Sequence, residues 1–90
     1  MSDGIGGNVY RAKILINLRK SILDPQGKAV HHALGSLGLK NVQDVRIGKY
    51  IEMKIDSVSQ EDAQRVTAEA CTKLLANPVM EDFSFTVERI

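Results

Sequence analysis

The sequence predicts an α+β fold whose elements follow one another in the order β-α-β-β-α-β. Three observations carry this prediction. Apolar and polar residues alternate in the first and last extended stretches, two stretches with helical spacing follow capping residues, and a glycine divides the middle extended stretch. A chain of 90 residues has room for one domain. We expect this domain over residues 9–90, after a flexible, Gly-rich tail over residues 1–8.

The first strand is predicted over residues 9–18, where apolar and charged side chains alternate. Arg11, Lys13 and Asn17 share one face, so we expect the strand to bury mainly its other face. That predicted buried face carries Tyr10, Ala12, Ile14, Ile16 and Leu18.

The first helix is predicted over residues 24–37. Asp24 offers a side-chain acceptor to the free N–H groups of the first turn, and Pro25 fits the first helical position, which needs no N–H. Gly38 ends the helix. Gly27 lies inside the first turn, where it weakens a helix by about 1 kcal/mol relative to alanine. The predicted apolar stripe consists of Val30, Ala33, Leu34 and Leu37.

The second half of the chain is predicted to form a hairpin, a helix and a last strand. The hairpin spans residues 41–55 and turns near Gly48, the helix follows Ser59 and runs to about Ala76, and the strand covers residues 83–88. The predicted inward side chains are Ile51, Met53 and Ile55 of the hairpin, Val66, Ala70 and Leu74 of the helix, and Phe83, Phe85 and Val87 of the strand.

Two helices on one face of a four-stranded antiparallel sheet satisfy this order, in a two-layer, ferredoxin-like sandwich. Such a sheet leaves two open edges, and Val9 and Leu15 make the outer face of the first strand partly apolar. We therefore expect a homodimer or a higher homo-oligomer.

The composition narrows the possible functions. A formal net charge of +1 argues against nucleic acid as a partner, and no apolar run is long enough to cross a membrane. The N-terminus lacks the pattern of a signal peptide, and Cys71 is the single cysteine, which allows no internal disulfide. A reducing cytoplasm is the expected location.

Catalytic and metal-binding patterns are incomplete. Cys71 lies in the middle of a predicted helix, where a buried apolar role is more common than a nucleophilic one. His31 and His32 are neighbours, whereas helical ligand pairs need a spacing of three or four residues. The segment "GKAV" lacks the rest of a phosphate-binding loop. We predict no catalytic, cofactor-binding or metal-binding residues on this chain.

Two binding modules share the predicted topology. An RNA-recognition motif needs stacked aromatic residues on its third strand, whereas this strand exposes Tyr50, Glu52 and Lys54, so RNA binding is rejected. An ACT-type regulatory domain binds amino acids near a glycine after its first strand, and Gly27 is placed nearly so. This second alternative stays open on the residues alone.

Three stretches together resemble the PurS family: "ILDPQGKAVHHAL", "VQDVRIGKYIEM" and "KLLANPVMEDFSF". They carry the family's L-D-P-Q-G-K-A, D-V-R-x-G-K and L-L-A-N-x-x-x-E-D motifs, in order and at family-like spacing. The resemblance covers about residues 9–88, nearly the whole chain.

The resemblance implies the small subunit of phosphoribosylformylglycinamidine (FGAM) synthase in de novo purine synthesis. In that enzyme a PurQ-type glutaminase releases ammonia, and a PurL-type synthetase uses ATP and magnesium to convert formylglycinamide ribonucleotide (FGAR) to its amidine. The small subunit would be a non-catalytic assembly subunit of this amidoligase that bridges the two and supports ammonia transfer.

The matched motifs also imply candidate residues for contacts with partner subunits. We expect the start of the first helix and the residues around Gly48 to face partners, with Gly27 admitting another backbone or a ligand. A bulky residue at position 27 is then expected to spare the fold and weaken assembly. The candidates are Asp24, Pro25, Gln26, Gly27, Arg46, Gly48, Lys49, Glu81 and Asp82.

Overall fold

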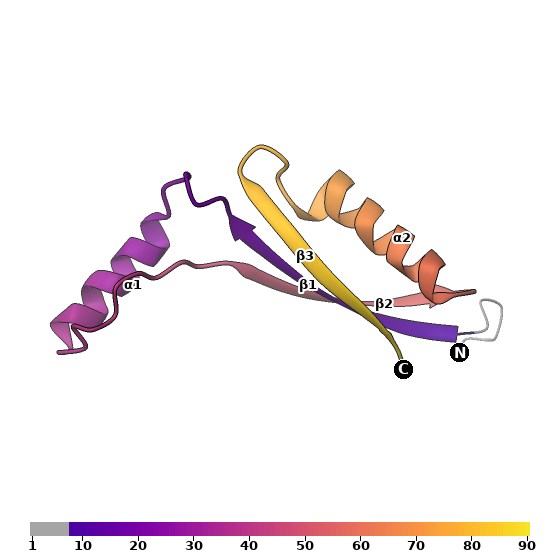
Figure 1. Ribbon diagram of the computed structural model, residues 1–90, viewed down its shortest axis with the longest axis horizontal. Coiled ribbons are helices and arrows are strands. Elements are labelled where there is room, and N and C mark those ends of the chain that lie inside the picture. The colour runs from indigo at the N-terminus through magenta and orange to yellow at the C-terminus, as the bar shows by residue number, and fades with distance from the viewer. Residues whose placement is uncertain (1–7) are drawn as a thin grey trace.

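The computed structural model describes residues 8–90 and has an elongated shape of 54 × 27 × 17 Å (Figure 1). The elements are β1 (Asn8–Leu18), α1 (Pro25–Ser36), β2 (Lys49–Ser57), α2 (Gln60–Ala70), the π-helical turn η1 (Cys71–Leu75) and β3 (Glu81–Arg89). The predicted α+β class is confirmed. Residue 8 belongs to β1, and the rest of the predicted N-terminal tail lies outside the described residues.

The strands form an antiparallel sheet in the order β2-β1-β3. β1 is the central strand, with Ile14 opposite Ile51 of β2 and opposite Phe85 of β3. This register places the predicted inward residues of all three strands on one face, as the alternating pattern requires. α2 lies across that face, and the other face carries no helix (Figure 1).

The core lies between α2 and β1. Ala12, Ile14 and Ile16 of β1 are completely buried, and Ala63 and Cys71 bury against the sheet from the helix. The Ser59 hydroxyl accepts a hydrogen bond of 3.1 Å from the Asp62 N–H, which confirms the predicted start of α2. Burial of these apolar side chains is the main force that holds the sheet and α2 together.

The prediction that Leu74 of the second helix points inward is wrong. Leu74 is 80% exposed, whereas Leu75 packs against the core. The Ala76 N–H bonds the Cys71 carbonyl oxygen across five residues, so the helix widens at η1. The widened turn contains an extra residue and moves the inward position from Leu74 to Leu75.

Within one chain the predicted four-stranded sheet with two helices on one face is not formed. The described chain has three strands, because residues 41–48 run extended without pairing, and no hairpin turns at Gly48. α1 projects beyond the end of the sheet instead of covering it (Figure 1). A Cβ at Gly48 would collide with the Ile16 carbonyl and the Asn17 side chain. This glycine therefore serves a close approach to β1 rather than a turn.

Candidate functional site

We call residues 19–48 the arm, and the three strands with α2 and η1 the body. The arm consists of α1 and the extended segment 41–48 that returns beside it (Figure 1). Because the fold gives the arm no sheet to cover, the arm is free to meet other molecules. Six of the nine predicted contact residues lie in it, and Arg46 is one of them.

Asp24 joins the start of α1 to segment 41–48, the two parts of the arm. Its carboxylate accepts a hydrogen bond of 2.9 Å from the Gly27 N–H and one of 2.7 Å from the Ile47 N–H. The carboxylate is 4% exposed, and its pKa is lowered by the Ile47 and Gly27 N–H donors and by the nearby Arg46 charge. Asp24 is thus both the predicted helix cap and a bridge to the returning segment.

Gly27 is buried against its own chain. A Cβ at this position would collide with the Val45 carbonyl oxygen and press on the Asp24 carboxylate. The predicted close approach of another backbone is therefore made by the arm itself. We expected a bulky residue here to spare the fold, but within the arm this expectation is wrong. The Val45 carbonyl is a backbone group that cannot rotate away, so α1 and segment 41–48 must move apart.

Two further contacts fasten the arm. The Arg46 guanidinium donates to the Arg19 and Ile22 carbonyl oxygens at 2.9 and 3.0 Å, and the His31 Nε2 lies 2.7 Å from the Val42 carbonyl. The Leu39 N–H bonds the Leu34 carbonyl at 3.0 Å, which closes α1 as predicted, with Gly38 at a φ of 91°. Directional hydrogen bonds hold the arm together in place of an apolar core.

The arm meets the body at a cluster of charges that we call the neck. The Lys49 ammonium lies 3.5 Å from the Glu81 carboxylate, and the Arg19 guanidinium lies 3.2 Å from Asp82. Arg19 also donates to the Pro78 carbonyl at 2.7 Å. These pairs join residues far apart in sequence, so the structure brings the predicted contact residues Lys49, Glu81 and Asp82 together.

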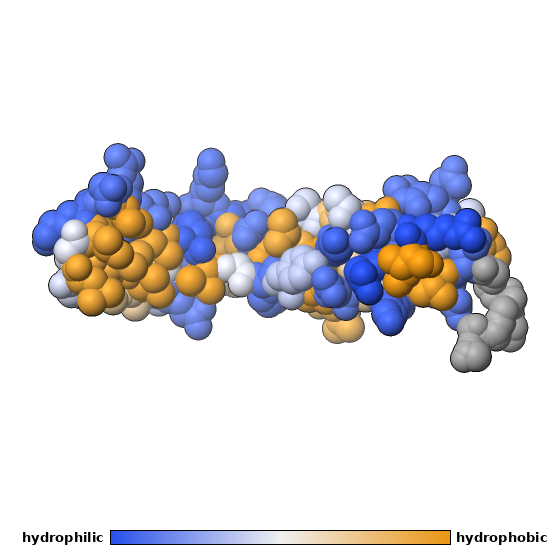
Figure 2. All heavy atoms as spheres, turned by 90° about the horizontal axis from the view of Figure 1, so that it is seen from below, coloured by the Kyte–Doolittle hydropathy of each residue, from blue (hydrophilic) through white to orange (hydrophobic). Residues whose placement is uncertain are grey.

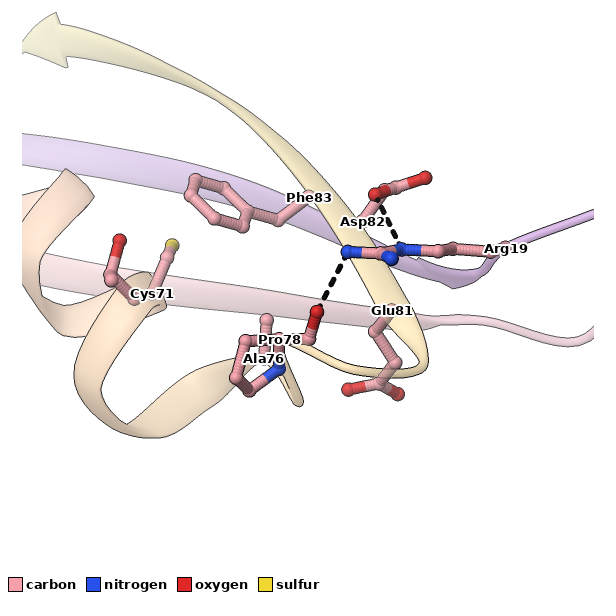
Figure 3. Close-up of a pocket in the computed structure, with 8 residues that line it drawn as sticks. Arg19, Cys71, Ala76, Pro78, Glu81, Asp82 and Phe83 are labelled. Carbon is pink, nitrogen blue, oxygen red and sulfur yellow. Dashed lines mark hydrogen bonds and ion pairs between the residues drawn. The ribbon is translucent and has the colours of Figure 1, made fainter. Parts of the chain in front are cut away.

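A cleft of about 400 Å³ opens at the neck between η1 and the start of β3 (Figure 3). Cys71 and Ala76 line it from the helical side, and Phe83 lines it from the sheet. Figure 3 shows the Cys71 side chain directed toward the Phe83 ring, with Arg19 held by Asp82 and Pro78 at the other end. Burial raises the pKa of the Cys71 thiol, which disfavours the reactive thiolate.

The arm exposes a large share of apolar surface. Figure 2 shows hydrophobic side chains gathered over one face of the arm end of the molecule. Leu37 is 76% exposed, and Val30 of the same predicted stripe is 39% exposed. The further exposed apolar side chains of the arm are Leu23, Leu39 and Ile47. Contiguous apolar surface of this kind marks a protein–protein contact.

Among residues 8–90, no three His, Cys, Asp or Glu side chains converge on a point where a metal ion would bind. None of the described helices is long and apolar enough to cross a membrane. His32 is exposed on α1, and its neighbour His31 is half-buried in the contact with Val42.

The predicted contact residues divide into two groups. Asp24 and Gly27 are buried within the arm, whereas the other seven leave side chain or backbone accessible. Two further residues were not predicted from the sequence: Arg19, which fastens the neck, and Val45, whose carbonyl oxygen lies against Gly27. A lone arginine after a strand and a valine carbonyl carry no recognisable sequence signal, since their roles arise from contacts across the fold.

Known proteins resemble this chain over most of its length. Residues 11–89 match the family model for PurS, phosphoribosylformylglycinamidine (FGAM) synthase. The PurS subunits of that synthase from Bacillus subtilis and Methanocaldococcus jannaschii are 49% and 38% identical to it. Each alignment covers 91% of this chain, and they cover 96% and 99% of the two relatives.

Solved structures agree with these matches. The Bacillus subtilis PurS structure in its C2 crystal form has a TM-score of 0.79 at 51% identity, covering 88% of this chain and 98% of that one. A chain in the structure of PurLQS from Thermotoga maritima has a TM-score of 0.80 at 27% identity, covering 91% and 98%. On the family model, the sequence identity and the fold, this chain belongs to the PurS family.

Proposed function

We propose that this chain is the small, non-catalytic assembly subunit of FGAM synthase in de novo purine biosynthesis. It binds a PurL-type synthetase and a PurQ-type glutaminase and bridges them. The single observation that carries the proposal is the PurS family membership, which extends to a chain in a PurLQS structure. The exposed arm supports it, because a segment that covers nothing in its own chain is suited to cover another.

The chemistry is divided among the subunits in this proposal. The glutaminase releases ammonia from glutamine, and the synthetase uses ATP and magnesium to convert FGAR to FGAM. This chain contributes position: it holds the two partners so that ammonia passes between them at a high effective concentration without escaping to water. Cytoplasmic location fits a purine-pathway enzyme and a chain with one free cysteine.

The proposal includes a homodimer or a higher homo-oligomer. β2 and β3 each have one unpaired edge, residues 41–48 are extended and unpaired, and Phe83 at the neck is 37% exposed. The arm of a second copy carries both missing parts, an amphipathic helix and an extended segment. A dimer in which each arm covers the body of its partner restores the predicted four strands and two helices.

The candidate contact residues take different roles in this assembly. Asp24, Gly27 and Gly48 act indirectly, because they shape the arm and its approach to β1. Pro25 and Gln26 are exposed at the start of α1. Arg46 also acts indirectly, because its guanidinium bonds the Arg19 and Ile22 carbonyl oxygens of the arm. The remaining candidates, which we assign to direct contact through the neck, are Lys49, Glu81 and Asp82.

Reconstitution tests the proposal. The chain is mixed with PurL-type and PurQ-type subunits from the same source, and FGAM formation is assayed with glutamine or with ammonia as the nitrogen source. We expect glutamine-dependent synthesis to require this chain, which is inactive alone. Equal glutamine-dependent synthesis without it would overturn the proposal and direct attention to the ACT-type alternative, tested as amino-acid binding by the isolated chain.

A further inference from the structure

α1 has two different flanks. Val30, Ala33 and Leu37 follow one another at spacings of three and four residues, so they form one apolar row along the helix. A second row, at spacings of four residues, consists of Lys28, His32 and Ser36. The side of α1 between these rows is turned toward segment 41–48, as the buried Gly27 and the bonded His31 show.

The second row forms one wall of an open cleft of about 520 Å³. The turn after α1 forms the other wall and brings Lys40 to the same cleft. Lys28 and Lys40 are exposed, and neither makes an ion pair within residues 8–90. No acidic side chain lines this cleft, so its positive charge is uncompensated.

Charge is segregated along the chain. The arm, residues 19–48, contains five Lys or Arg and two Asp, a formal charge of +3, whereas residues 49–90 carry five Lys or Arg and eight acidic residues, a charge of −3. One of the two Asp residues, Asp24, is buried, and the other, Asp44, does not line the cleft. The net charge of +1 is therefore the sum of a positive charge on the arm and a smaller negative charge on the rest of the chain.

We propose that the basic cleft of Lys28, His32, Ser36 and Lys40 binds an acidic, Asp- or Glu-bearing segment of another subunit of the synthase. The inference deepens the proposed function and rests on it. Exposed lysines without an acidic partner in their own chain can pair with Asp or Glu side chains on the surface of another protein. Such charge complementarity also speeds the association of the two proteins. The apolar row on the other flank stays available for a second copy.

Two other occupants fit less well. Several acidic residues of a second copy are already paired with lysine or arginine of their own chain, as Glu88 is with Lys13 and Glu69 is with Lys73. A small free anion needs donors that converge on it, whereas Lys28 lies in the first turn of α1, Lys40 lies beyond the other end of the helix, and both are exposed in an open cleft. The acidic segment is therefore the occupant that the cleft fits best.

The test compares two charge-reversal variants of the full chain. K28E/K40E reverses the cleft, and K54E/R89E reverses two exposed cations of the body that make no ion pair within the described residues. Binding of each variant to the PurL-type and PurQ-type subunits is measured by titration at low and high salt, with sedimentation velocity to compare homo-oligomeric state.

We expect K28E/K40E to bind one partner about tenfold more weakly at low salt and with a flatter salt dependence, while the control variant and self-association match wild type. Equal partner binding by both variants would overturn this inference and leave the proposed function intact. No binding by wild type would overturn the proposed function itself. Phosphate binding that K28E/K40E alone loses, with partner binding unchanged, would make the cleft an anion site and overturn docking.

Discussion

The body and the arm are held together by different forces. The body buries Ala12, Ile14 and Ile16 completely against α2, and hydrophobic burial is the main force that stabilises it. The arm is fastened by hydrogen bonds from Asp24 and Arg46 to backbone groups, while its apolar row faces outward. This chain therefore folds around one core and leaves a second apolar surface exposed on the arm.

The largest expected effect comes from Ile14→Ala in the body. Ile14 is completely buried at the centre of the sheet, so the loss of its side chain leaves a cavity and lowers the free energy of unfolding by about 2–5 kcal/mol. Urea denaturation followed by circular dichroism measures this change. A loss below about 1 kcal/mol would contradict a body held by its core.

A second substitution separates the arm from the body. Gly27→Val places a side chain against the Val45 carbonyl. We therefore expect segment 41–48 to separate from α1 at a cost of about 1–3 kcal/mol while the sheet stays intact. Hydrogen exchange measures this: the Ile47 amide, which bonds the Asp24 carboxylate, loses protection and β1 keeps it. Gly35→Ala is the matched control, because nothing lies within 4 Å of a Cβ there.

The apolar row of the arm is tested by Leu37→Asp. Leu37 is 76% exposed, so the monomer tolerates the change, whereas burial of the new charge against a second copy weakens self-association about tenfold or more. Sedimentation equilibrium measures the dissociation constant. Val58→Asp, at a body residue that is 71% exposed, is the control. Unchanged self-association in both variants would remove the arm from the dimer interface.

The smallest expected effect is on pH dependence. The N–H groups of Ile47 and Gly27 hold the pKa of Asp24 below its ordinary value, so the folded arm binds this proton more weakly than the unfolded chain. Its stabilisation is therefore full above the unfolded-state pKa of about 3.9 and is lost as pH falls through the lowered pKa. NMR chemical shifts of the Ile47 amide follow this opening.

Asp24→Asn provides the control for the pH experiment. Asn keeps an acceptor oxygen for the helix start but carries no charge to titrate. We expect the Ile47 amide of this variant to show a weaker bond at neutral pH and no further change on acidification. An Ile47 amide that responds to acidification in Asp24→Asn as it does in the wild type would show that the Asp24 charge does not fasten the arm.

The strands and helix ends that depend on neighbouring residues alone were predicted correctly from the sequence. Alternation placed β1 and its buried face, and Asp24, Gly38 and Ser59 marked helix ends that the structure confirms. The predicted hairpin failed because a glycine that admits a close neighbour and one that allows a turn look alike in sequence. At Gly48 the neighbour is β1, which only the fold reveals.

The arrangement of α1 was beyond prediction for a similar reason. An apolar stripe such as Val30 to Leu37 indicates that one face of the helix packs against other apolar groups. It does not indicate whether those groups belong to the same chain or to another. The neck joins Arg19 to Asp82, 63 residues apart, and no local pattern encodes such a pair. The motifs around Gly27 and Gly48 led to the predicted partner contacts but carried no information on how the arm is built.

Removal of the arm tests the central claim most directly. Ile16 of β1 lies opposite Lys49 of β2, so a short Gly-Asn-Gly turn can join residues 18 and 49 and leave the body as a three-stranded sheet with α2. We predict that this variant keeps a cooperative unfolding transition but fails to restore glutamine-dependent FGAM synthesis with the PurL-type and PurQ-type subunits. Full glutamine-dependent synthesis by the armless chain would contradict the claim that the arm is the assembly surface.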